Sequence, residues 1–304
     1  MGIYWRILVV LVTGISFVSK PVFSQPVPEI FRVAYTLSPK IELKNNDGEV
    51  FNTPVNYLKV ALNFPILQSR QWVVINEIKY NQFYTDITDY GPTHVNIHDI
   101  TNMGFGIKAV KKSGSFNLLF TAETVYGSTN PADLSFKKLN YKFGTGILWK
   151  YKSRPFELVG FGIGASTDYG APLVIPFLTI GLKVNRQFRI DAFLPFQSRF
   201  SFSLSPKTKT GLYHDTHFEA FYFNNNVKTD SLQFGKIRSL SMGLFIEQKL
   251  YNHIYLFTGY GFITGNSFLI YDYKNRQIDE LKSNRIVFVN FGLSLKINKD
   301  APEF

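Results

Sequence analysis

Five histidines are the residues of this chain best suited to metal binding or acid–base chemistry. Two groups combine histidine with acidic residues: His94, His98 and Asp99, and further along His214, Asp215, His217 and Glu219. Side chains alternate along a strand, so His217 and Glu219 share one face and His214 takes the other. Neither group alone supplies the fixed tetrahedral or octahedral ligand set that a metal needs. We interpret these histidines as solvated loop residues and predict no metal site and no cofactor.

A serine hydrolase embedded in the membrane is the enzyme hypothesis to weigh. It needs a serine with a histidine on its own or a neighbouring strand, or an Asp/His pair near the outer rim. No serine of this sequence lies in a Gly-x-Ser-x-Gly turn. Gly160-Phe-Gly-Ile-Gly164 resembles a phosphate-binding loop, but no helix follows it. We therefore predict no catalytic residues and no enzyme, with an outer-membrane hydrolase of phospholipase or protease type as the alternative.

The elements that would position any such group are β-strands. From Tyr141 to Tyr151 one parity reads Tyr, Phe, Thr, Ile, Trp, Tyr, and the other reads Lys, Gly, Gly, Leu, Lys. The same period of two recurs from Tyr57 to Ile66 and from Val287 to Ile297, and it indicates strands with one apolar and one polar face. Aromatic residues at the edges of such runs are typical of lipid-facing strands with aromatic girdles.

The overall composition favours a membrane barrel. The chain is rich in aromatic residues (16%, with 30 Phe and 17 Tyr), yet its mean hydropathy is −0.02, as expected when each strand has a polar face. It has no cysteine, which excludes a disulfide framework, a thiolate metal site and a cysteine nucleophile. The alternative is a secreted soluble β-barrel or β-sandwich binding protein, whose apolar parity would face inward.

The N-terminus has the layout of a secretory signal peptide. Arg6 precedes the apolar run from Ile7 to Val18, and Lys20 and Val22-Phe-Ser24 follow, with the small residue Ser24 at the expected cleavage position. This run is shorter than the roughly 20 apolar residues of a transmembrane helix. We predict a signal peptide over residues 1–24, followed by one barrel domain over residues 25–304.

The connections between the expected strands alternate between tight and long. We predict a closed antiparallel transmembrane β-barrel of about 12 strands, in a range of 10 to 14, over residues 31–43, 55–67, 72–84, 101–111, 116–126, 139–151, 156–166, 173–184, 188–204, 237–249, 253–271 and 285–297. The long connections, at 44–54, 85–100, 127–138, 167–172, 205–236 and 272–284, should be outer loops. Leu212 to Phe223 looks like a further strand, and we interpret it as a hairpin arm within the long outer loop 205–236.

Charged residues fall on the polar parity that should face the lumen. The candidate lumen-lining residues are Lys59, Lys108, Lys142, Lys150, Lys183, Arg189, Asp191, Glu247 and Lys296. In a water-filled pore this excess of cations would favour anions. In a plugged barrel the lysines would instead pair with Glu123, Glu157 and the acidic candidates and conduct nothing, and an interior of this size allows either state.

The stretch from Pro172 to Pro195, followed by Phe200-Ser-Phe-Ser-Leu204, resembles a group of Bacteroidota outer-membrane barrels catalogued as a domain of unknown function. The shared pattern is a strand, a tight polar turn, a second strand and a Leu-Pro pair. The resemblance implies the barrel fold and the bacterial outer membrane as location, and it implies no catalytic or binding residue.

We therefore expect a passive channel or a structural or surface protein of the outer membrane, with a cation-lined lumen. Its expected partners are outer-membrane lipid and lipopolysaccharide, the barrel-assembly machinery during biogenesis, and small anionic solutes. Lys207 and Lys209, in the expected outer loop, could contact lipopolysaccharide phosphates. Nucleic acid is not an expected partner, because the basic residues are spread along the chain.

Overall fold

The computed structural model describes residues 29–90, 95–129, 139–151, 155–167, 173–223, 234–272, 274 and 276–296. The regular elements of these residues are strands, all in one sheet. Among them, no helix has the length and apolar character needed to cross a membrane. The predicted signal peptide, residues 1–24, lies outside the described residues.

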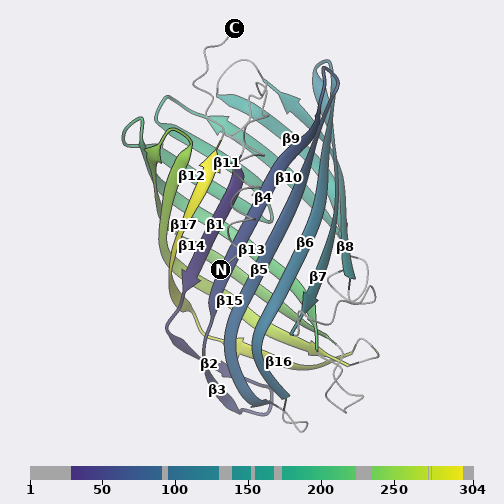
Figure 1. Ribbon diagram of the computed structural model, residues 1–304, viewed down its shortest axis with the longest axis vertical. Helices are drawn as coiled ribbons and strands as arrows, with labels where there is room; N and C mark the ends of the chain where they lie inside the picture. Colours follow the sequence, from purple (N-terminus) through teal and green to yellow (C-terminus); the bar gives the residue numbers. More distant parts are fainter. Residues whose placement is uncertain are drawn as a thin grey trace, which may run out of the picture.

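Fourteen antiparallel strands close into a barrel (Figure 1). In wall order they are β1 (Glu29–Leu37), β4 (Asn56–Gln68), β5 (Trp72–Tyr90), β6 (Val95–Ser113), β7 (Phe116–Ser128), β8 (Leu139–Lys150), β9 (Phe156–Ser166), β10 (Leu173–Lys183), β11 (Phe188–Leu194), β12 (Gln197–Ser203), β13 (Thr208–Tyr222), β14 (Phe234–Tyr251), β15 (Ile254–Tyr271) and β17 (Ile286–Lys296). Pairing of β17 with β1, from Leu37↔Val289 to Glu29↔Lys296, closes the ring. The predicted fold class is therefore confirmed, with a strand count inside the expected range.

The two ends of the barrel differ. Tight turns join β4 to β5, β6 to β7, β10 to β11, β12 to β13 and β14 to β15, and they lie at the top of Figure 1. We call this the inner end, because short turns of outer-membrane barrels face the periplasm. At the opposite, outer end the wall is extended by three short strands: β2 (Lys40–Lys44), β3 (Val50–Pro54) and β16 (Gln277–Ser283).

Residues 188–204, predicted as one strand, form two. β11 ends at Leu194, a turn at Pro195 and Phe196 reverses the chain, and β12 pairs with β11 from Phe193↔Gln197 onward. The turn is closed by a 2.8 Å hydrogen bond from the Phe196 amide to the Phe193 carbonyl. Proline cannot donate to a strand ladder, so it ends the strand. This short turn lies at the outer end, where long loops were predicted, and the two strands were therefore predicted as one.

The hairpin arm predicted within an outer loop at 205–236 is wrong. Its residues form β13, a wall strand that pairs with β12 from Gln197↔Asp215 to Ser203↔Lys209 and with β14 along its whole length. Lys207 consequently lies in a tight turn at the inner end, not in an outer loop. The predicted outer loops 44–54, 85–100 and 272–284 are also largely strand.

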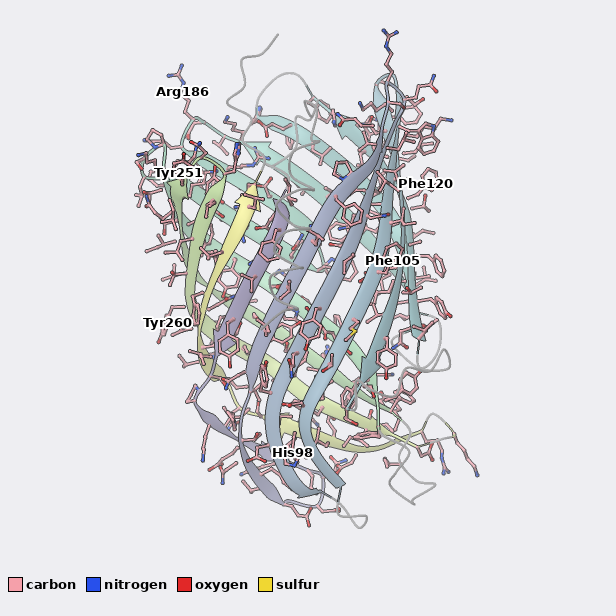
Figure 2. The ribbon with its side chains drawn as sticks, in the orientation of Figure 1. His98, Phe105, Phe120, Arg186, Tyr251 and Tyr260 are labelled. Atoms are coloured by element: carbon pink, nitrogen blue, oxygen red, sulfur yellow. The ribbon has the colours of Figure 1, made fainter. Side chains whose placement is uncertain are left out.

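The outward face carries the apolar parity. Exposed apolar side chains surround the wall, including Phe143, Phe161, Val174, Leu244 and Tyr260, each more than half exposed. Phe105, Phe120 and Tyr260 project away from the ribbon in Figure 2. Apolar side chains exposed all round a closed sheet are expected where the wall contacts lipid.

The barrel narrows towards its outer end. There β13 crosses to β7, where Tyr222 pairs in parallel with Ser128 and its carbonyl accepts a 3.1 Å hydrogen bond from the Thr129 amide. Gly127 permits this approach, because a Cβ atom at that position would overlap the Ala220 carbonyl. The strands from β8 to β12 therefore belong to the wide inner part of the barrel, whereas β7 and β13 meet at its narrow outer part.

Candidate functional site in the barrel interior

An apolar core fills the narrow outer part. Its side chains come from both ends of the sequence: Leu43, Tyr57, Phe83, Ile87, Ile97, Ile100, Phe221, Phe223, Ile237, Phe268, Ile270 and Leu281. Most of them are fully buried. We call this cluster of close-packed apolar side chains the outer seal.

On the inner side of the outer seal, Glu219 of β13 contacts strands from the other side of the lumen. Its carboxylate accepts hydrogen bonds from the Tyr57 hydroxyl of β4 at 2.7 Å, from the Asn81 amide of β5 at 2.9 Å, and from the Asn102 amide of β6. These three donors and the carboxylate form a polar layer on the inner side of the apolar cluster. This network ties β13 across the interior.

Two residues closer to the inner end on β4, Lys59 also contacts β13. Its ammonium group lies 2.9 Å from His217 Nδ1 and 3.5 Å from Asp215 Oδ2. Asp215 Oδ2 is also 3.1 Å from His217 Nε2. Lys59 therefore points into the interior, where a carboxylate offsets its charge.

A second group lies along β5, β6 and β7. Glu77 Oε2 is 2.9 Å from Lys108 Nζ and 3.1 Å from Lys79 Nζ, and Lys79 also lies 2.9 Å from Glu123 Oε1. The Lys108 side chain is 45% exposed. Since it belongs to the inward parity of β6, water reaches this part of the lumen.

A third group links β9 and β11. Arg189 forms a bidentate pair with Asp191, at 2.7 and 2.8 Å, and its remaining nitrogen lies 2.6 Å from Glu157 Oε2. Bidentate contacts fix the guanidinium plane. Both acids thus offset the Arg189 cation.

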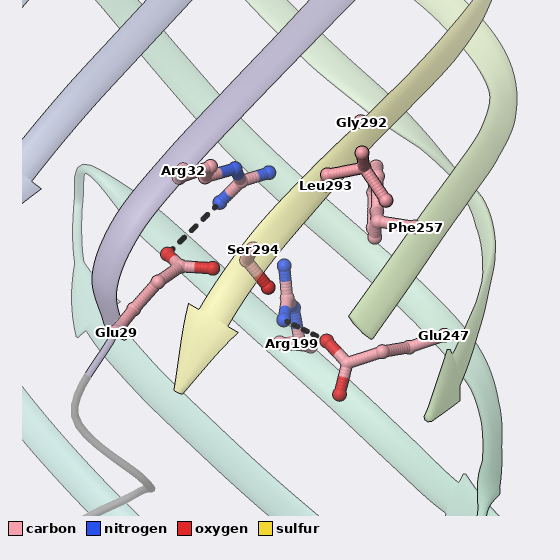
Figure 3. A pocket seen from close by; sticks show the side chains of 8 residues that line it. All are labelled: Glu29, Arg32, Arg199, Glu247, Phe257, Gly292, Leu293 and Ser294. Carbon is pink, nitrogen blue, oxygen red and sulfur yellow. Dashed lines mark ion pairs between the residues drawn. The ribbon is translucent and has the colours of Figure 1, made fainter. Parts of the chain in front are cut away.

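At the inner mouth, two arginines face a small cavity (Figure 3). Arg32 Nη1 lies 3.7 Å from Glu29 and Arg199 Nη1 lies 3.8 Å from Glu247, which also contacts Lys296. The cavity has about 10 Å³ open to water, roughly enough for one molecule. Other lining residues are Phe257, Gly292, Leu293 and Ser294.

The remaining lumen candidates lie on the polar parity. Lys142 of β8 is opposite Glu123, Lys150 ends the same strand opposite Leu158, and Lys183 of β10 is opposite Arg189. The structure thus brings Arg189 together with Asp191, and Lys296 with Glu247, but it spreads the other candidates around the wall. Wherever an ion pair is described, an acid offsets the interior cation.

Several interior residues were not predicted to face the lumen. Asp215, His217 and Glu219 were assigned to a loop, and Tyr57, Asn81 and Asn102 carried no signal beyond the polar alternation of their strands. Their meeting depends on the crossing of β13, which local pattern does not encode. Among the described residues no cluster of three or more metal-ligating side chains occurs, and His94 lies outside them.

A family model described as Domain of unknown function (DUF6268) matches residues 22–299. Among curated proteins nothing matches the sequence. Similar solved structures include an outer-membrane channel from Pseudomonas putida F1 (9% identity, 91% of this chain and 100% of that chain covered, TM-score 0.46). The translocator domain of the autotransporter NalP from Neisseria meningitidis is similar over 97% of this chain and 95% of that chain (9% identity, TM-score 0.34). The NanC porin is similar over 88% and 100%, respectively (8% identity, TM-score 0.36).

Proposed function

Because the chain belongs to the DUF6268 family, a family of unknown function, we propose its role from its own geometry: a bacterial outer-membrane channel that is closed at rest. In this proposal a vestibule opens to the periplasm, and the outer seal separates it from the exterior. The observation that carries the proposal is a polar lumen at the inner end together with an apolar outer seal at the outer end.

The proposal replaces a passive cation-lined pore by a gated one. Six of the described interior cations have carboxylates within ion-pair distance: Lys59, Lys79, Lys108, Arg189, Arg199 and Lys296. Such pairing opposes a strong preference for anions. Opening would require β13 to separate from β7 at Tyr222 and Ser128, because the outer seal contains Phe221 of the same strand.

The second candidate is a structural or surface barrel that never conducts. The observation that favours it is the Glu219 network, whose three donors from β4, β5 and β6 hold β13 in place. Under either candidate the partners we propose are outer-membrane lipid, lipopolysaccharide and the assembly machinery, and small anionic solutes only if the lumen opens.

Single-channel recording in planar bilayers under a KCl gradient separates these candidates. Wild-type protein should be silent or open only briefly. Phe221→Ala, which removes a fully buried ring from the outer seal, should raise the open probability. Phe143→Ala is the matched control, because it removes a phenylalanine from the lipid-facing side.

A disulfide provides a reversible lock. The chain has no cysteine, so Ser128→Cys with Tyr222→Cys, added to Phe221→Ala, introduces one pair at the β7–β13 contact. Oxidation should silence this protein and reduction should restore its conductance. Steady conductance of the wild type would refute the closed state. Silence of the folded Phe221→Ala protein would refute the channel and leave the structural role.

A further inference from the structure

On the lipid-facing side of β12 and β13, a serine, a histidine and a threonine form a hydrogen-bonded row. Ser198 and His214 are register partners, with Ser198 Oγ 3.5 Å from His214 Nδ1. On the other side of the ring, His214 Nε2 lies 3.1 Å from Thr216 Oγ1. The row ends where the Thr216 hydroxyl donates to the Pro195 carbonyl at 3.2 Å.

The row has a defined direction. Because the Thr216 hydroxyl gives its proton to Pro195, its oxygen can accept one from His214 Nε2. Neutral histidine then presents the lone pair of Nδ1 to Ser198. This is the arrangement of an activated nucleophile: a hydroxyl, a base beside it, and a third group that orients the base.

Its position exposes the row to lipid. On the same lipid-facing side, Phe200 and Leu212 lie next to the row, toward the inner end of the barrel, and are 41% and 55% exposed. The turn at Pro195 and Phe196, which joins β11 to β12, lies next to the row toward the outer end. The row thus lies on the lipid-facing side at the outer end of β12, next to an apolar surface on which acyl chains can lie.

Polar side chains facing lipid are costly and commonly mark function. We propose that Ser198 and His214 are catalytic residues for hydrolysis of an acyl ester of a membrane lipid, with Thr216 as a positioning residue. This activity is independent of whether the lumen conducts. Arg189 and the other interior ion pairs have no part in it.

The reaction is an ordinary acyl transfer. Ser198 Oγ forms a bond to the ester carbonyl carbon while its proton passes to His214 Nδ1. The bond from that carbon to the alcohol oxygen breaks, and the alcohol leaves with the proton from His214. Water then attacks the acyl-serine carbon and gives a proton to His214. The bond from that carbon to Ser198 Oγ breaks, His214 returns the proton to Oγ, and the fatty acid is released.

The test uses the full-length barrel in phosphatidylcholine vesicles that contain a fluorogenic phospholipid ester. Folding of every variant is checked by its heat-modifiable electrophoretic mobility. Wild type should release fatty acid, and Ser198→Ala and His214→Ala should reduce release to the rate of vesicles alone. Ser203→Ala on the same strand and His98→Ala at the outer end are matched controls and should retain the wild-type rate.

Two further readouts separate catalysis from a structural role. A fluorophosphonate should label Ser198, identified by peptide mass, and His214→Ala should abolish labelling. Thr216→Val should lower kcat with KM unchanged, and Thr216→Ser should restore it. A folded wild-type barrel that neither hydrolyses the phospholipid nor takes the label at Ser198 would overturn the proposal, as would hydrolysis that survives Ser198→Ala.

Discussion

The Glu219 carboxylate of β13 accepts a 2.7 Å hydrogen bond from the Tyr57 hydroxyl of β4, although β14, β15, β17 and β1 lie between these two strands in the wall. A contact of this kind spans the lumen. It places a charged acceptor on the inner side of the apolar side chains of the outer seal. Glu219 therefore lies at the boundary between the apolar outer seal and the polar inner part of the lumen.

Removing the Glu219 acceptor should destabilise the barrel. Glu219→Ala leaves the donors of Tyr57, Asn81 and Asn102 without their carboxylate, at a cost of about 1–3 kcal/mol for each donor that water does not reach. Glu219→Gln, which keeps one acceptor oxygen, should cost less. Urea unfolding in lipid vesicles, followed by heat-modifiable mobility, measures both. The exposed Glu42→Ala is the control, and equal stability of the Glu219 and Glu42 variants would contradict the prediction.

The pair formed by Lys296 and Glu247 should behave as a buried ion pair, because their side chains are only 11% and 7% exposed. Lys296→Met leaves the Glu247 charge with Arg199 at 3.8 Å as its remaining described partner. We expect a loss of about 3–5 kcal/mol. Glu247→Gln in the same protein should recover part of it. Additive effects of the two substitutions in a double-mutant cycle would refute the coupling.

The outer seal should not tolerate added volume at Gly235. A Cβ atom there would overlap the Phe221 ring, so Gly235→Ala should cost about 1–3 kcal/mol by overpacking. Phe221→Leu should relieve part of that cost in the double variant. Gly164→Ala is the control, because the nearest atom to its Cβ, the Phe143 carbonyl oxygen, lies at 3.4 Å. Equal unfolding midpoints for the two alanine variants would show that the outer seal is loosely packed.

Asp272, just beyond the outer end of β15, should titrate at unusually low pH. Partial desolvation raises the pKa of its carboxyl, but this is outweighed by hydrogen bonds from the Lys274 amide at 2.8 Å and from the Arg276 amide and side chain at 2.9 and 2.8 Å, so the pKa lies below its ordinary value. A lowered pKa means that the ionised form stabilises the turn. That contribution is complete above about pH 4, near the unfolded pKa, and is lost as the pH falls through the folded pKa.

A ¹³C NMR titration of the Asp272 carboxyl measures this pKa directly. Arg276→Gln, which removes the guanidinium but leaves the backbone amide, should move the midpoint part of the way back. A midpoint at or above about 3.9, the value of an ordinary aspartate, would contradict the role assigned to these hydrogen bonds.

The sequence determined which face of each strand meets lipid. Alternation with a period of two is a local property, because successive side chains point to opposite faces whatever the strand pairs with. It predicted the outward parity from Tyr141 to Tyr151 and from Val287 to Leu293, and the alternation of tight and long connections predicted an outer-membrane barrel. The predicted count is two below fourteen for two reasons. Residues 188–204 form two strands separated by the turn at Pro195, and the predicted hairpin arm is part of the wall strand β13.

Only the tertiary structure decided what the interior contains. The outer seal, the Glu219 network and the row from Ser198 to Thr216 all depend on the position of β13, which pairs with β12 and β14 and then crosses to β7. Residues more than a hundred positions apart meet there, as Tyr57 and Glu219 do. Register and crossing follow from packing of the whole wall, so a local pattern assigns a residue to a face but not to its partner.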